Sequence, residues 1–192
     1  MSAATRVEIA NMALLRIGQR TIASFEESSV EATLAKRWYD RTRKTVLASA
    51  PWRFAVKNAE LAVLSDAESG KYLYAYALPS DLIRALYLCD QTGAELPVEY
   101  EVVGNQIWTD DDTGQLRYVW DQTDPNRFDV LFIDVLAYKL AAELATGITG
   151  RTDLAASMLQ AYVALLPSAK SASAGAARKP QNLGQSLKDS RA

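Results

Sequence analysis

Apolar residues recur at intervals of three or four positions in four stretches of the sequence. This spacing places them on one face of a helix, so it predicts an α-helix in each stretch. The first stretch shows the pattern clearly, with Val7, Ala10, Leu14 and Ile17. We expect the four helices at about residues 5–18, 29–49, 125–146 and 152–166.

Capping and stop signals mark the ends of these helices. Residues 5–8 (TRVE) and 28–31 (SSVE) fit capping boxes, in which a serine or threonine and a later glutamate satisfy each other's backbone N–H groups. The pair Asp124-Pro125 combines a cap with a proline at the first helical position. The third helix is expected to end near Gly147, and Pro167 is expected to interrupt the fourth.

Between the second and third helices the apolar period falls from 3.6 to 2, which is typical of half-buried strands. The strand-like segments lie within about residues 74–121, and turn signals at 90–93, 104–105 and 110–114 separate them. Gly104-Asn105 is the sharpest signal, because a two-residue hairpin needs the positive φ that these residues tolerate. The expected fold is α+β (mainly α): a four-helix bundle with an inserted antiparallel β-meander between helices two and three, plus an extended C-terminal tail.

The last segment of the chain is basic and rich in small residues. From Ser168 onward it has five basic residues and one acidic residue, and Leu183 and Leu187 are its only sizeable apolar side chains. Such a segment cannot bury enough surface to offset the entropy lost on ordering. It is either a flexible tail or one that becomes ordered against a partner. We therefore divide the chain into a folded domain at 1–167 and a tail at 168–192.

The composition argues against several classes of chemistry. The sequence has no histidine, which is the commonest general base and metal ligand, and its single cysteine is Cys89. One cysteine forms neither an intramolecular disulfide nor a zinc cluster, so we expect a buried structural thiol. We expect no enzyme, no catalytic residues, no metal site and no cofactor. A hydrolase that uses carboxylates alone is the remaining enzymatic alternative, although no pair of carboxylates stands out in an apolar setting.

Charge and hydropathy limit the partners. A net charge of −2 argues against strong binding of bare DNA by the whole chain. The first residues lack the apolar centre of a signal peptide, and no apolar stretch has the length needed to cross a bilayer. We expect a soluble protein made in a reducing cytoplasm, with no membrane partner.

The acidic turn at 109–114 (TDDDTG) suggests a calcium loop as one alternative. Asp110 and Asp112 would supply two oxygen ligands at alternate positions. However, Gly114 falls one position too early for such a loop, and the distal glutamate is missing. A solvated hairpin turn is the preferred interpretation.

The second helix carries a basic face that is formed by Arg37, Arg41 and Lys44. Such a face is typical of phosphate binding, but also of a solvated surface or of pairing with acids of a neighbouring subunit. No aromatic platform is interleaved with these basic residues in the sequence. The third helix is apolar almost all round and needs cover from a second subunit or from the β-insert. Phe128 and Phe132, together with the basic face, are our candidates for a subunit interface or a channel surface.

The segment at 49–62 (SAPWRFAVKNAELA) places two large aromatic residues directly after a proline. Pro51 must follow the end of the second helix, because proline disfavours helical geometry in the residue before it. An extended chain would direct Trp52 and Phe54 to one side and Arg53 to the other. We interpret Pro51, Trp52 and Phe54 as a structural anchor, with a wedge for a base or sugar as the alternative.

Three of these segments resemble a known family, the head-to-tail adaptor or tail tubular protein A-like proteins of tailed bacteriophages. They are residues 10–27 (ANMALLRIGQRTIASFEE), 39–62 (YDRTRKTVLASAPWRFAVKNAELA) and 74–88 (YAYALPSDLIRALYL). The expected order of two helices, strands and two further helices is also similar to that family, and the resemblance covers most of residues 5–165.

The resemblance implies a structural virion protein at the head–tail junction, made in the cytoplasm of a host bacterium. It implies a homo-oligomeric ring, a dodecamer, that binds the portal protein, extends the DNA channel and presents a surface to a downstream nozzle or stopper protein. DNA would pass through the lumen without specific binding. Whether the phage is short-tailed or long-tailed stays open.

The resemblance also implies that the tail reaches the portal. The residues that would bind there are Lys170, Arg178, Lys179, Leu183, Leu187, Lys188 and Arg191. Each tail would bind weakly, because ordering it costs entropy, but a ring would present many tails at high effective concentration. The alternative function is a nucleic-acid-binding module that uses the basic face of the second helix and the basic tail.

Overall fold

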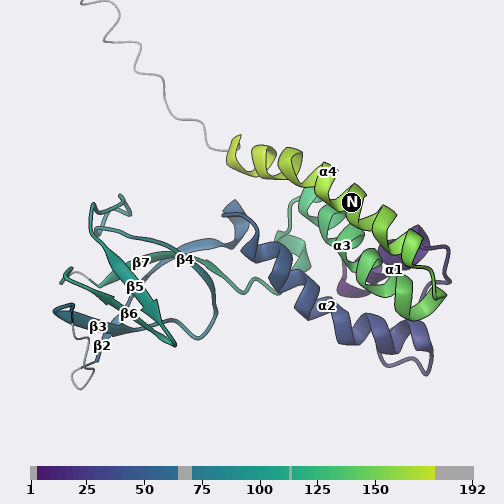
Figure 1. The fold of residues 1–192 in the computed structure, drawn as a ribbon, viewed down its shortest axis with the longest axis horizontal. Coiled ribbons are helices and arrows are strands. Elements are labelled where there is room, and N and C mark those ends of the chain that lie inside the picture. The colour runs from purple at the N-terminus through teal and green to yellow at the C-terminus, as the bar shows by residue number, and fades with distance from the viewer. Residues whose placement is uncertain (1–3, 65–70, 113, 176–192) are drawn as a thin grey trace, which may run out of the picture.

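The computed structural model describes residues 4–64, 71–112 and 114–175. This described part contains four α-helices and two antiparallel sheets, which confirms the α+β class. The helices are α1 (Arg6–Arg16), α2 (Val30–Ala48), α3 (Val130–Thr149) and α4 (Thr152–Gly175). They gather at one end of an elongated molecule, and the strands form the other end (Figure 1). We call residues 4–55 and 121–175 the helical body, and the described residues of 56–120 the β module.

The first two helices begin close to the predicted positions. Thr5 caps α1 with the full capping box: the Glu8 N–H donates to Thr5 Oγ1 over 3.1 Å, and the Thr5 N–H donates to Glu8 Oε2 over 2.6 Å. In α2 the cap is Ser29, whose Oγ accepts from the Ala32 N–H, and not Ser28 as expected. The capping residue therefore lies one position later than the sequence signal.

The third helix differs from its predicted range of 125–146 at both ends. Asp124 and Pro125 begin a short 3₁₀ turn (Pro125–Arg127), and α3 itself begins at Val130. The helix continues through Gly147 and ends before Gly150, which has the left-handed φ of 70°. The Asp124-Pro125 signal therefore starts the 3₁₀ turn and not α3. The glycine that ends α3 is Gly150 and not Gly147.

The fourth helix does not end at Pro167 but continues to Gly175. A proline in a helix leaves the carbonyl four residues earlier without its donor, and here that residue, Val163, lies on the exposed side, where water can solvate the group. Ala169 and Ser173, beyond the proline, are buried against the body and hold the last turns in place. Residues 168–175 of the predicted extended tail are therefore helical, and 176–192 lie outside the described residues.

The strands of the β module form two sheets, so the structure does not confirm the predicted β-meander. The strands are β1 (Val56–Glu60), β2 (Ala62–Val63), β3 (Tyr74–Ala77), β4 (Leu82–Leu88), β5 (Tyr100–Val103), β6 (Gln106–Thr109) and β7 (Gln115–Trp120). Their order is β1-β7-β4 in one sheet and β2-β3-β6-β5 in the other. The β region also begins earlier than residue 74, because β1 pairs with β7 along its whole length. β7 lies in the centre of the three-stranded sheet, and its residues Leu116, Tyr118 and Val119 are all buried.

The predicted hairpin at Gly104-Asn105 is confirmed. These residues join β5 to β6, and Gly104 alone of the two has a positive φ, of 61°. At the acidic turn, Gly114 also has a positive φ, and a Cβ there would lie 2.6 Å from the ring of Tyr76. Only glycine fits that position.

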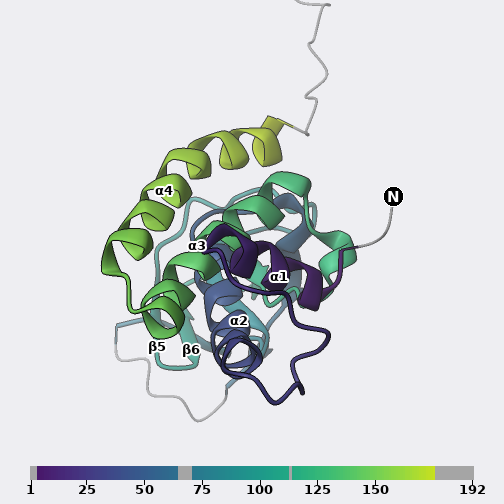
Figure 2. The same cartoon turned by 90° about the vertical axis from the view of Figure 1, so that its right-hand side faces the viewer.

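Two apolar cores follow from this arrangement. The larger lies in the helical body and includes Leu14, Trp52 and Phe132, while the smaller lies in the β module and includes Tyr76 and Ile107. Figure 2 shows α3 with α1, α2 and α4 around it, and α3 contacts all three. The third helix, for which we expected cover from a second subunit or from the β-insert, is therefore covered largely by the other three helices.

Candidate functional site

An aromatic corner forms where α2 ends and the β module begins. The Phe132 ring centroid lies 5.0 Å from that of Trp52 and 4.8 Å from that of Phe54, both nearly edge-on. Phe128 joins the cluster 4.9 Å from Phe132. The indole Nε1–H of Trp52 donates to the carbonyl of Val46 over 2.9 Å, so its one polar atom is satisfied. The proposed anchor residues Trp52 and Phe54 thus meet the interface candidates Phe128 and Phe132 inside one core.

The backbone at this corner is not extended as predicted. Residues Arg53–Ala55 form a 3₁₀ turn, and Ala55 is fully buried together with Trp52. Pro51 precedes the turn and is exposed. A simple alternation of sides fails here because the tight turn rotates successive side chains by about 120° and not 180°.

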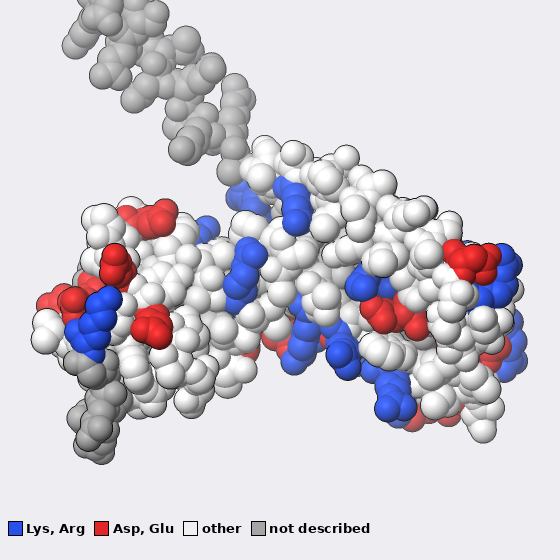
Figure 3. Space-filling model, in the orientation of Figure 1, with Lys and Arg blue, Asp and Glu red and all other residues white. Residues whose placement is uncertain are grey.

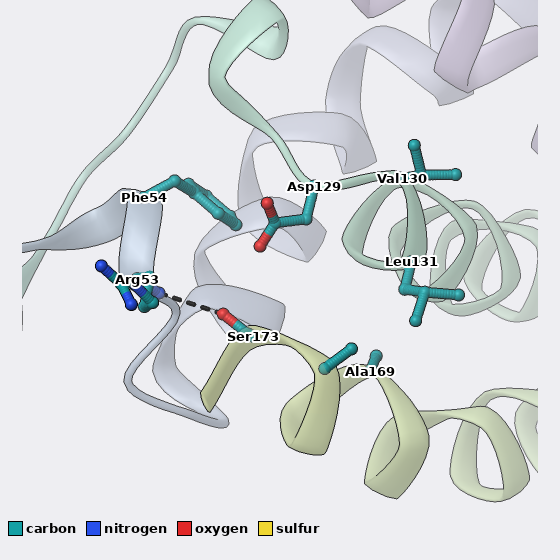
Figure 4. A pocket seen from close by; sticks show the side chains of 8 residues that line it. Arg53, Phe54, Asp129, Val130, Leu131, Ala169 and Ser173 are labelled. Carbon is teal, nitrogen blue, oxygen red and sulfur yellow. Dashed lines mark hydrogen bonds between the residues drawn. The ribbon is translucent and has the colours of Figure 1, made fainter. Parts of the chain in front are cut away.

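A groove of about 470 Å³ lies beside the aromatic corner (Figure 4). The turn after α2, the start of α3 and the last turns of α4 form its walls. Its lining residues are Arg53, Phe54, Asp129, Val130, Leu131, Ala169, Ala172 and Ser173. Val130 is 75% exposed although it is apolar. The groove combines an apolar wall with one acidic and one basic side chain.

A hydrogen bond closes the groove at the end of α4. The backbone N–H of Arg53 donates to Ser173 Oγ over 3.1 Å, as the dashed line in Figure 4 marks. Lys170, the first of the predicted portal-binding residues, lies on this part of α4 and is half-buried. Arg178, Lys179, Leu183, Leu187, Lys188 and Arg191 lie outside the described residues. The groove therefore borders the point from which the chain continues into them.

The basic face of α2 is only partly available. Lys44 Nζ lies 3.1 Å from Asp121 Oδ2, which leaves Arg37 and Arg41 without a carboxylate partner among the described residues. Arg41 holds its guanidinium 5.3 Å from the ring centroid of Trp38. A hollow of about 280 Å³ is lined by Leu34, Arg37, Trp38 and Arg41. Trp38 is an aromatic platform that the sequence pattern did not reveal, since its place in the apolar stripe suggested burial.

A buried arginine joins α2 to the two residues that follow β7. Arg43 is 2% exposed, forms an ion pair with Asp121, and donates from Nη1 to the carbonyl of Gln122 over 2.6 Å. Burial alone would raise the pKa of Asp121, but hydrogen bonds from Arg43 and Lys44 outweigh it and hold that pKa below its usual value. This joint was missed from the sequence, because Arg43 looked like one more basic residue on an exposed helix.

A second polar cluster lies in the β module. Lys57 Nζ lies 2.7 Å from Asp81 Oδ2, and the Tyr118 hydroxyl donates to Asp81 Oδ1 over 3.0 Å. The hydrogen bond to Asp81 raises the pKa of Lys57, so the amine stays charged. An amine nucleophile needs the opposite shift. The cluster therefore suits a structural role, in which it fixes the β3–β4 connection against β1 and β7.

The remaining candidates show no reactive setting. Cys89 is buried, as expected, and burial raises the pKa of its thiol, which keeps it protonated. Asp110 of the acidic turn accepts a hydrogen bond from the Leu73 N–H over 2.9 Å. Within residues 4–64, 71–112 and 114–175, no group of three or more histidine, cysteine, aspartate or glutamate side chains is placed to hold a metal ion. No helix in the same ranges is both long and apolar enough to cross a membrane.

No protein-family model matches this sequence, and no curated protein matches it. The resemblance to head-to-tail adaptors therefore stays a prediction.

Proposed function

We propose that the chain is a structural virion protein of a tailed bacteriophage, a head-to-tail adaptor that binds the portal and provides the attachment surface for the next tail component. In this proposal the helices act as one bundle, and the β module is an insert that projects from it. Copies assemble into a ring, which we expect to be a dodecamer, and DNA passes through the lumen. The protein has no catalytic role.

The observation that carries this proposal is the outer surface of α4. Between Asp153 and Lys170 the helix has no charged residue. Ala156, Leu159, Val163 and Pro167 follow at intervals of three or four, so they share one face. Leu159 is 42% exposed and Val163 is 59% exposed. We call these four residues the α4 stripe.

An uncharged stripe on the outside of a helix suits contact with another protein. Continuous apolar surface on a soluble protein marks interaction sites, whereas scattered apolar residues need no explanation. The stripe runs toward the same end of α4 as the groove at Ala169 and Ser173. In the proposal, stripe and groove together meet the portal ring, and the residues after Gly175 extend that contact.

The test measures how strongly the full chain binds to assembled portal rings of its phage. We expect the variant L159E/V163E to join portal rings at least tenfold more weakly, because two carboxylates would have to be desolvated in the contact. The matched control is S157E/S168E, which adds the same charge about 140° around the same helix. Equal joining by the two variants would contradict the role of the stripe.

A second experiment tests the end of the chain. Truncation belongs after Gly175 and not after Pro167, because Ala169 and Ser173 help to hold α4 on the body. We expect the truncated chain to fold normally and to lose most of its joining to portal rings. Full joining would remove the tail from the proposal.

The alternative, a nucleic-acid-binding module, has one observation in its favour. Arg37 and Arg41 lie beside Trp38, and a base could stack on an indole while guanidinium groups contact phosphate. Binding of this kind weakens steeply with salt. A gel shift at two salt concentrations separates the two functions, because the adaptor predicts no tight binding at either.

A further inference from the structure

Acidic and basic side chains are divided unequally between the two parts of the molecule. The described residues of the β module have nine acidic and four basic side chains, a net charge of −5. Those of the helical body have thirteen basic and eleven acidic side chains, a net charge of +2. In Figure 3 acidic side chains spread over the β end, and basic ones gather along the lower side of the body. Two copies could therefore attract each other end to end.

The positive side of such a contact is the α2 face. Val30, Leu34, Arg37 and Arg41 follow at intervals of four, three and four residues, so they share one face of α2. Val30 is 61% exposed, and Leu34 and Trp38 line the hollow beside the two arginines. This surface offers apolar contact area next to two guanidinium groups that no described carboxylate neutralises.

The negative side is the outer face of the four-stranded sheet. Glu101 and Val103 are two residues apart on β5, so they share this face. Trp108 on β6 is paired with Glu101 and lies on the same face. The inner face of the same sheet packs into the core through Tyr76 and Ile107. Glu101 is exposed and has no basic partner among the described residues, and Val103 is 37% exposed. β5 is also an edge strand, so among the described residues no further strand pairs with its free edge.

We propose that the outer sheet face of one copy docks on the α2 face of the next copy. Glu101 pairs with Arg37 and Arg41, while Val103 and Trp108 cover Leu34 and Trp38. Both surfaces combine apolar side chains with charge, and the charges are opposite, so contact area and electrostatic complementarity agree.

The two faces are different surfaces on different parts of the molecule. A contact between unlike faces is heterologous, and it repeats from copy to copy until it closes as a ring or continues as a filament. Closure as a ring rests on the proposed function; the pairing of the two faces does not.

The first test uses engineered cysteines. In the chain L34C/V103C each copy carries one cysteine on each face and keeps the charged residues of the contact, so mild oxidation should produce a ladder of dimers, trimers and larger species on a non-reducing gel. The matched control, L34C/R151C, replaces the sheet cysteine by one at the exposed start of α4. Cys89 is buried and should contribute no cross-link. A ladder from the control that equals that of L34C/V103C would overturn the proposal.

The second test breaks one face at a time. We expect R37E/R41E and E101K each to weaken self-association, measured by sedimentation velocity, at least tenfold. In a mixture of the two variants, the intact sheet face of one meets the intact α2 face of the other, and the reversed charges at positions 37, 41 and 101 also attract each other, so association should recover. Unchanged association of either variant alone, or no recovery in the mixture, would refute the pairing.

The outcomes also separate this contact from the proposed function. A chain that joins portal rings but gives no ladder, even on those rings, overturns the contact and leaves the adaptor function standing. A ladder from a chain that never joins portal rings does the reverse. If R37E/R41E loses salt-sensitive DNA binding while the ladder of L34C/V103C is absent, the α2 face belongs to the nucleic-acid alternative.

Discussion

The helical body and the β module achieve order in different ways. The body surrounds one central helix, α3, whose buried side chains contact three other helices. The β module has a smaller core between two sheets, and its outer strands are open at their edges. Its Lys57–Asp81 pair lies at the surface, whereas the Arg43–Asp121 pair of the body includes a buried arginine. We therefore expect the body, with its larger core, to be the more stable of the two parts.

The largest expected difference concerns the two cores. Phe132→Ala removes the ring on which Trp52, Phe54 and Phe128 pack, and should lower the free energy of unfolding by about 3–5 kcal/mol. Ile107→Ala in the β module should cost about 2–5 kcal/mol locally. Hydrogen exchange should show lost protection throughout the chain for Phe132→Ala but mainly in the module for Ile107→Ala. Equal patterns for the two variants would contradict the division.

The joint between α2 and the residues that follow β7 comes next. Arg43→Met would leave Asp121 and the Gln122 carbonyl without their buried partner, at a cost of about 3 kcal/mol. The pKa of Asp121 is lowered in the folded protein, so its contribution is present above the usual aspartate pKa and is lost as the pH falls below about 4. Urea unfolding at several pH values measures both effects. Arg41→Met, at an exposed position on the same helix, is the control and should change stability by less than about 0.5 kcal/mol.

The smallest effect is expected at Lys57. Both partners of the Lys57–Asp81 pair are more than a third exposed, so Lys57→Met should cost less than about 1 kcal/mol. The pKa of Lys57 is raised, so its contribution is full below the usual lysine pKa and is lost as the pH rises above about 10. Thermal unfolding at neutral and at alkaline pH would measure this. A variant that loses as much stability as Arg43→Met would mean that the module relies on this pair far more than its exposure implies.

Much of the body could be predicted from the sequence because its signals are local. Apolar spacing identified four helices, and the Thr5 capping box appears as predicted. The errors at the ends of α3 and α4 have one cause. Gly147 and Pro167 are strong local stop signals, but tertiary packing of the residues beyond them continues the helices.

The sheet order and the polar joints could not be read in the same way. β7 lies between β1 and β4, and the pairing joins residues far apart in the chain. Alternation in a strand tells which residues share a face but not which strand lies next to it. Likewise, the partner of Arg43 is Asp121, and no spacing rule connects a helix residue to a position that distant. Among the candidate site residues, Trp52 and Phe54 of the anchor pack against Phe128 and Phe132. The spacing of these residues in the sequence did not predict that contact.

The bond between the Arg53 backbone and Ser173 has a mechanical consequence. It fastens the last described turn of α4 to the segment that leads directly into β1. Tension applied to the chain after Gly175 would therefore reach the root of the β module without first unwinding α4. One hydroxyl group thus links the two ends of the molecule along a path much shorter than the polypeptide itself.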